Sequence, residues 1–294
     1  MHGVATRQDR RLGYAARGNS STRVTIVLLA LALGLSTLSF FLGPADIAPA
    51  DLIAGLFSDH GSASVIAREI RLPRALLALF VGAALGASGA ALQGLFRNPL
   101  AEPGITGVTS SAGLGAVIAL YFGLATLSAA VLPACAVAGA LVSAAILYFL
   151  SRAGAGVMAL VLAGVAIASL ATALTALALS LAPNPYAMSE MVLWMMGSLK
   201  DRTLADLTFA VPLTVAGIAL LASAARGLDA LTLGEEAAHS LGIDVGSVRR
   251  RVVFGGALAT GAATAAAGAV SFVGLVVPQR LRPFYGYESA RRIL

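Results

Sequence analysis

Long stretches of apolar residues without a charged side chain dominate this sequence. A helix needs about 20 such residues to cross a bilayer, and most of the stretches reach that length. The runs are residues 24–43, 75–96, 105–125, 127–150, 157–182, 204–225, 252–270 and the shorter 271–277. They predict an all-α polytopic membrane protein of about eight transmembrane helices, with a transmembrane domain over residues 24–294 after a polar N-terminal tail, residues 1–23.

The composition excludes a soluble domain. The 294 residues are 58% hydrophobic and only 12% charged, whereas soluble domains carry about 25% charged residues. The first run, 24–43, is longer than the ~7–15 apolar residues of a signal peptide, and more runs follow it. We therefore interpret it as the first transmembrane helix.

The net charge of +6 reflects the orientation of the chain in the membrane. The arginines stand at the ends of apolar runs, which is the pattern of the positive-inside rule, and they form no stripe among aromatic residues that would suit nucleic acid. The connections on the side of the N-terminal tail carry Arg97, Arg152, Arg226, Arg249, Arg250 and Arg251. This distribution predicts a multi-pass protein of the cytoplasmic membrane with its N-terminus inside.

The sequence offers no source of energy and no catalytic constellation. Asp206 is the only Asp, Glu, Lys, Arg or His within the longer runs, whereas proton- or ion-coupled carriers usually place such residues inside the membrane. No phosphate-binding loop of the G-x-x-x-x-G-K-[ST] type occurs. Cys135 is the only cysteine and the three histidines are far apart, so we predict no metal site, cofactor or catalytic residue, and we expect a separate partner to supply the energy.

The run 75–96 carries a stripe of small residues. Gly82, Gly86, Ala90 and Gly94 recur every four residues and would form one smooth helix face. Such faces let helix backbones approach each other closely in lipid. We interpret the stripe as structural and predict a tight bundle around this helix.

Three polar segments lie beside the membrane, and the first is residues 68–74. Pro73 suits the first turn of a helix, and Arg71 and Arg74 would project on one side of it. They either reach toward lipid headgroups or receive carboxylates from a docking partner.

The second segment, residues 93–104, contains Pro99 and Pro103 around Glu102. The two prolines end the preceding helix and prevent it from resuming at once. The segment is either an ordinary inside loop or non-helical backbone that lines a cavity.

The third segment predicts a short amphipathic helix over about residues 232–243. Its face would contain Leu233, Ala237, Ala238 and Leu241, with Gly242 as the C-terminal cap. Such a helix either lies on the membrane or docks into a groove of a partner. Glu235 and Glu236 fit poorly with anionic lipid and favour the groove.

Together these segments resemble the FecCD-type permeases of ABC importers, which handle iron–siderophore complexes, haem and cobalamin. The resemblance extends from about Val24 to the end of the chain. It rests on IRLPR at 70–74, GLFRNPLAEPG at 94–104, LAGVA at 162–166, LWMMGSL at 193–199, LGEEAAHSLG at 233–242 and SFVGLVVP at 271–278.

The resemblance implies a ten-helix type II importer fold, of which this chain would hold about eight helices and lack the last two. It also implies roles for individual residues. Arg71 and Arg74 would dock the extracytoplasmic binding protein, and the loop at 151–158 would form a gate element beside the gate at Asn98, Pro99 and Leu100. The helix that couples to the ATPase would use Leu233, Gly234, Glu235, Ala238, Leu241 and Gly242.

The function implied is that of the membrane-spanning permease of an ABC importer for an iron–siderophore-type chelate. Its partners would be a second permease subunit, identical or related, two cytoplasmic ATPase subunits, a binding protein and the bilayer. The alternatives are a haem or cobalamin permease of the same family, a non-functional truncated remnant and, on weaker grounds, a secondary transporter.

Overall fold

The computed structural model describes residues 7–58, 60–154 and 156–285, and every regular element in these residues is helical. The long helices are α1 (Arg7–Phe41), α4 (Leu72–Phe96), α5 (Val108–Tyr121), α6 (Val131–Arg152), α7 (Val157–Ser180), α9 (Leu204–Leu231), α11 (Val245–Ala267) and α12 (Val273–Tyr285). The short elements are α2 (Pro49–Phe57), α3 (Ser62–Val65), η1 (Ile66–Arg71), η2 (Pro103–Thr106), η3 (Leu124–Thr126), α8 (Pro185–Met196) and α10 (Glu235–Ser240).

Each predicted apolar run overlaps one of the long helices, so the predicted all-α membrane fold is confirmed. Within the described residues, five continuous helical stretches are long and apolar enough to span a bilayer by themselves: Thr22–Phe41, Ser62–Phe96, Val131–Arg152, Val157–Ser180 and Leu204–Leu231. The other three of the predicted eight fall short. Helices α5 and α12 have only 14 and 13 residues, and α11 carries arginines in its first two turns.

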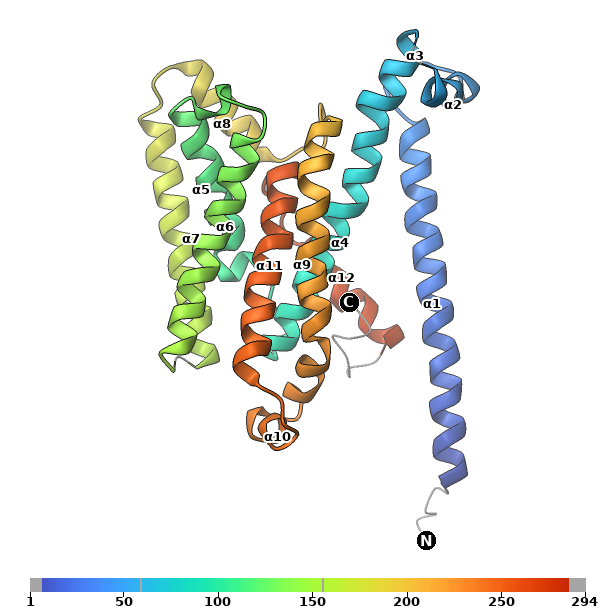
Figure 1. Ribbon diagram of the computed structural model, residues 1–294, viewed down its shortest axis with the longest axis vertical. Coiled ribbons are helices and arrows are strands. Elements are labelled where there is room, and N and C mark those ends of the chain that lie inside the picture. The colour runs from blue at the N-terminus through green and yellow to red at the C-terminus, as the bar shows by residue number, and fades with distance from the viewer. Residues whose placement is uncertain (1–6, 59, 155, 286–294) are drawn as a thin grey trace.

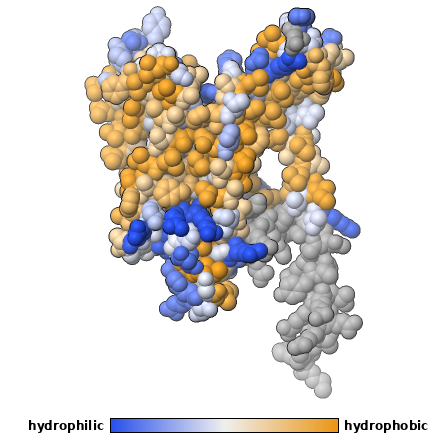
Figure 2. Space-filling model, in the orientation of Figure 1, coloured by the Kyte–Doolittle hydropathy of each residue, from blue (hydrophilic) through white to orange (hydrophobic). Residues whose placement is uncertain are grey.

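Helices α4 and α11 form the centre of the bundle (Figure 1). Helix α11 packs against α4, α5, α6 and α9, and α4 also contacts α1 and α12. The apolar part of α4 is 67% buried, whereas that of α1, at the edge of the bundle, is 6% buried. On the surface, apolar side chains cover the middle of the molecule, and hydrophilic ones gather toward its two ends (Figure 2).

The close approach predicted along α4 occurs at a different glycine. A Cβ at Gly82 would meet nothing within 4 Å, and one at Gly86 would make an ordinary contact with Val277. A Cβ at Gly89 would instead overlap the carbonyl oxygen of Gly274, in the first turn of α12. Gly86 of the stripe and Gly89 thus both face α12, and the backbones approach most closely at Gly89, because sequence spacing does not show at which turn the partner backbone arrives.

The two ends of the bundle carry different connections. Helix α10 and the N-terminal part of α1 lie at one end, and α2, α3 and α8 lie at the other (Figure 1). The chain passes from one end to the other along α6, α9 and α11. Helices α6 and α9 therefore end near α10, and α11 begins there.

Candidate functional site

The arginines of the first polar segment bind the ends of two helices. Arg71 is 2% exposed, and its Nη1 donates hydrogen bonds to the carbonyl oxygens of Phe40 and Phe41 at 3.3 and 2.7 Å. Its Nη2 donates to the carbonyl oxygen of Ala45 at 2.7 Å. The last carbonyls of a helix have no partner within the helix and attract cations. Arg71 therefore caps the C-terminus of α1.

The neighbouring arginines make similar bonds. Nη2 of the half-buried Arg74 donates to the carbonyl oxygen of Leu42 at 3.1 Å, and Nε of Arg68 donates to that of Leu56 at 2.9 Å, at the end of α2. The guanidinium of Arg71 thus makes three hydrogen bonds within the chain and that of Arg74 makes one, and docking of a binding protein through Arg71 and Arg74 stays a prediction. A partner could reach Arg71 only by breaking three hydrogen bonds, whereas Arg74 is more accessible.

The predicted gate follows a helix end of well-defined geometry. Arg97 ends α4 in the left-handed conformation, with φ at 49°, and the N–H of Asn98 donates to the carbonyl oxygen of Gln93 at 3.2 Å. The side chain of Asn98 then accepts the N–H of Leu100 at 2.9 Å. Asn98, Pro99 and Leu100 are all exposed. They form a turn at the surface.

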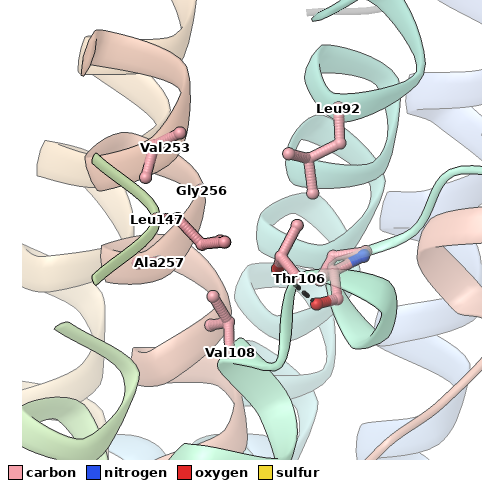
Figure 3. Close-up of a pocket in the computed structure, with 8 residues that line it drawn as sticks. Leu92, Thr106, Val108, Leu147, Val253, Gly256 and Ala257 are labelled. Carbon is pink, nitrogen blue, oxygen red and sulfur yellow. Dashed lines mark hydrogen bonds between the residues drawn. The ribbon is translucent and has the colours of Figure 1, made fainter. Parts of the chain in front are cut away.

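The chain returns to the interior directly after this turn. Pro103 and Thr106 of η2 are buried, Thr106 Oγ1 donates to the carbonyl oxygen of Pro103 at 2.6 Å, and Ser143 Oγ of α6 donates to that of Thr106 at 2.9 Å. Figure 3 shows Thr106 facing a cavity between α4, α5, α6 and α11. Of the two readings left open for this segment, the structure favours non-helical backbone buried in protein.

This cavity is small. Its volume of about 10 Å³ is enough for about one water molecule. Helix α7 closes the site from another side, because a Cβ at Gly164 would overlap the carbonyl oxygen of Ile105 in η2. The next residue after η2, Gly107, adopts a φ of 74° and would also clash with α7 if it carried a side chain.

Helix α12 holds the predicted gate through contacts that the sequence analysis missed. Gln279 Nε2 donates to the carbonyl oxygen of Pro99 at 2.9 Å, and Arg282 Nη2 donates to Gln93 Oε1 at 2.9 Å. Gln93 in turn donates to the carbonyl oxygen of Leu275 at 3.4 Å. The sequence signal for these contacts was Gln93, a polar residue within the apolar run 75–96.

The third segment forms α10, which is shorter than the predicted 232–243. Gly234 precedes it with φ at 107°, and Gly242 follows it with φ at 77°. The N–H groups of Gly242 and Ile243 donate to the carbonyl oxygens of His239 and Ala238 at 2.9 and 3.0 Å. This is the paired bonding of a Schellman cap, so the prediction of Gly242 as the cap is confirmed.

The predicted apolar face of this segment is wrong. Ala238 is fully buried in the core, while Leu233 and Leu241 are 69% and 63% exposed. Helical spacing does not relate these residues, since Leu233 and Leu241 lie outside the six residues of α10. The segment thus presents two leucines, together with the exposed Glu235 and Glu236, at one end of the molecule.

The ionisable residue found within the apolar runs stands at a helix end. Asp206 Oδ2 accepts the N–H of Thr203 at 2.8 Å, and its Oδ1 lies 3.9 Å from Nη1 of Arg202. These contacts form a capping box at the start of α9. Among the described residues, no cluster of three or more His, Cys, Asp or Glu side chains could hold a metal ion.

Comparisons with known proteins agree over most of the chain. The family model described as the FecCD transport family matches residues 28–294. A solved metal-chelate type ABC transporter in an inward-facing conformation superposes with a TM-score of 0.80 at 27% identity, over 92% of this chain and 84% of that one.

Curated relatives differ in what their names say they carry. A cobalamin import permease of Halobacterium salinarum is 40% identical over 76% of this chain and 60% of its own length. A hemin transport permease of Yersinia pestis is 42% identical over 75% of this chain and 67% of its own length. An Fe(3+) dicitrate transport permease of Escherichia coli is 38% identical over 91% of this chain and 82% of its own. The chain thus spans less than two thirds of the length of the first of these relatives.

Proposed function

The chain belongs to the FecCD transport family, and on this premise we propose that it is the membrane-spanning permease subunit of an ABC importer in the cytoplasmic membrane. The observation that carries the proposal is the family match over residues 28–294. We further propose an iron–siderophore-type chelate as the cargo. Relatives named for hemin and Fe(3+) dicitrate support a complexed metal ion, and the relative named for cobalamin keeps that cofactor as the alternative.

The absence of an ion relay along the described spans supports an external motor. Asp206 is engaged in a helix cap and an ion pair, so it is not placed to carry protons through the bundle. A secondary transporter would need ionisable side chains deeper in the membrane. We propose that two cytoplasmic ATPase subunits supply the energy instead.

The size of the central cavity supports a paired permease. A volume of about 10 Å³ is far below the roughly 300–1,000 Å³ that small-molecule sites enclose. A chelate does not fit this cavity, and because the FecCD family implies a permease partner, we propose that it passes between two permease subunits, identical or related, with the gate at Asn98, Pro99 and Leu100 at the inner end of the pathway. An extracytoplasmic binding protein would deliver the cargo to the end that carries α2 and α3.

The ATPase contact gives the direct test of this function. We expect Leu233→Asp and Leu241→Asp each to lower retention of the ATPase subunits about ten-fold or more, because exposed apolar side chains are the usual anchors of such a contact. Leu127, which is 74% exposed near η3, provides the control Leu127→Asp. Retention is measured by copurification from membranes. Equal retention by all three variants would contradict docking through α10.

Binding-protein docking is tested at Arg74, the more accessible arginine. We expect Arg74→Glu to weaken the affinity for the importer's extracytoplasmic binding protein about ten-fold, because the reversed charge would repel its carboxylates. The exposed Lys200 provides the control Lys200→Glu. Affinities are measured with the permease in nanodiscs. An unchanged affinity in Arg74→Glu would mean that this arginine does not contact the binding protein and serves only to bind the carbonyl oxygen of Leu42 after α1.

A further inference from the structure

One arginine connects α10 with the end of a spanning helix. Arg249 lies in the second turn of α11, and its Nη1 donates a hydrogen bond to Ser151 Oγ, in the last turn of α6, at 2.9 Å. Its Nη2 lies 3.2 Å from Glu235 Oε1, in the first turn of α10, and forms an ion pair with it. A single guanidinium thus contacts elements that are far apart in sequence.

The burial of Arg249 shows that it is held in this position. Its side chain is 14% exposed, and its Nε is buried without a hydrogen-bond partner among the described residues. The next two residues differ, since Arg251 is exposed and donates to the carbonyl oxygen of Ser223, and Arg250 is half-buried. Burying a charge costs free energy unless it is paired, so the two contacts of Arg249 keep the guanidinium between α10 and α6.

The atoms that Arg249 joins lead toward the predicted gate. Ser151 precedes the connection from α6 to α7, and α7 packs against η2 at Gly164 without space for a side chain. The planar guanidinium fixes the positions of both acceptors relative to each other better than a flexible ammonium would. A displacement of Glu235 would therefore pull on Ser151 and on the helix that closes η2.

We propose that Arg249 is the positioning residue that transmits movement of α10 to the C-terminus of α6 and the connection into α7. The proposal rests on the proposed function for its role in transport. The bridge itself is a property of this chain alone. The two contacts of Arg249 can be removed separately. Ser151→Ala removes the hydrogen bond to α6 and leaves the ion pair with Glu235, whereas Glu235→Gln removes the negative charge of that ion pair.

The bridge is tested first without any partner protein. In a Cys135→Ala background, spin labels at the exposed positions Ala153 and Ser240 report the distance between the end of α6 and the end of α10 in nanodiscs. We expect Arg249→Gln and Ser151→Ala to broaden this distance distribution and the control Arg250→Gln to leave it unchanged. The exchange Arg249→Glu with Glu235→Arg should narrow it again. Unchanged distributions in folded Arg249→Gln and Ser151→Ala would overturn the proposal, and Ser151→Ala decides if Arg249→Gln does not fold.

The role in transport is tested with the assembled importer in proteoliposomes. We expect Arg249→Gln to retain the ATPase subunits and hydrolyse ATP while uptake per ATP falls roughly five-fold, which corresponds to about 1 kcal/mol of coupling. Arg250→Gln should keep the normal ratio. A normal ratio in Arg249→Gln would refute the transmission role and leave the importer function standing. If the unmodified chain did not bind ATPase subunits, the proposed function would be refuted. The distance measurements would still test the bridge through Arg249.

Discussion

Gly115→Ala will separate helices α5 and α6 and destabilise the bundle by about 2–3 kcal/mol, the upper part of the range for overpacked interiors. An added Cβ would overlap the carbonyl oxygen of Cys135 in α6. A backbone atom cannot rotate away as the end of a side chain can, so the two helices must shift. The free energy of unfolding is measured by denaturant titration in detergent micelles.

The control lies in the same helix. Gly113 is buried, but a Cβ there would meet nothing within 4 Å. Gly113→Ala should therefore change stability by less than about 1 kcal/mol, in the stabilising direction, because alanine restricts the unfolded chain more than glycine. Similar effects of the two substitutions would mean that the contact at Gly115 does not hold α5 and α6 together.

A second glycine at the same helix crossing predicts that alanine substitutions at the two glycines do not add in their effect on the free energy of unfolding. A Cβ at Gly139 of α6 would overlap the carbonyl oxygen of Ser111 in α5, so both glycines belong to one helix crossing. Once one substitution has moved the helices apart, the second has less to displace. We expect the double variant to lose clearly less stability than the sum of the two single losses.

The helices were predictable because an apolar run without charges has few alternatives in a membrane. The same argument could not find α8, whose twelve residues include Glu190 and stay outside the spans. Its local signals were present, since Asn184 Oδ1 accepts the N–H of Ala187 at 2.9 Å and Pro185 occupies the first turn. A cap of this kind marks the start of a helix but does not show whether the helix spans the membrane.

The site was predictable in its local chemistry and not in its long-range contacts. The cap at Gly242 and the turn after α4 depend on neighbouring residues, and the sequence shows these directly. The contact of Gln279 with Pro99 joins residues 180 positions apart, and Arg249 meets Ser151 across 98 positions. Such pairs depend on how helices pack, which spacing along one segment does not encode.

Arg71 is a second residue whose contacts depend on helix packing and not on local spacing. A spacing of three residues correctly grouped it with Arg74, but the acceptors come from the end of α1, 26 to 31 positions earlier. Gly43 contributes by leaving room, since a Cβ there would lie 3.1 Å from the guanidinium. A residue that resembles a docking group by sequence thus serves as a helix cap in the structure.

Arg71→Ala should destabilise the end of α1 by about 3 kcal/mol or more, because several charge-assisted hydrogen bonds are lost and buried carbonyls stay unpaired. Arg71→Lys should recover only part of this loss, since one ammonium cannot reproduce the fork between the carbonyl oxygens of Phe41 and Ala45. Hydrogen exchange over residues 38–45 measures the effect in nanodiscs. Arg74→Ala is the control, with one bond to Leu42 to lose, and it should accelerate exchange much less.

The same variants separate capping from docking. If Arg71 only caps α1, Arg71→Lys should bind the binding protein nearly as well as the unmodified chain, because the positive charge remains and the buried group makes no contact with the partner. A loss of binding in Arg71→Lys with unchanged exchange over residues 38–45 would contradict the cap and return Arg71 to the docking surface. Faster exchange with retained binding would leave Arg74 as the arginine through which a partner's carboxylate engages this end of the bundle.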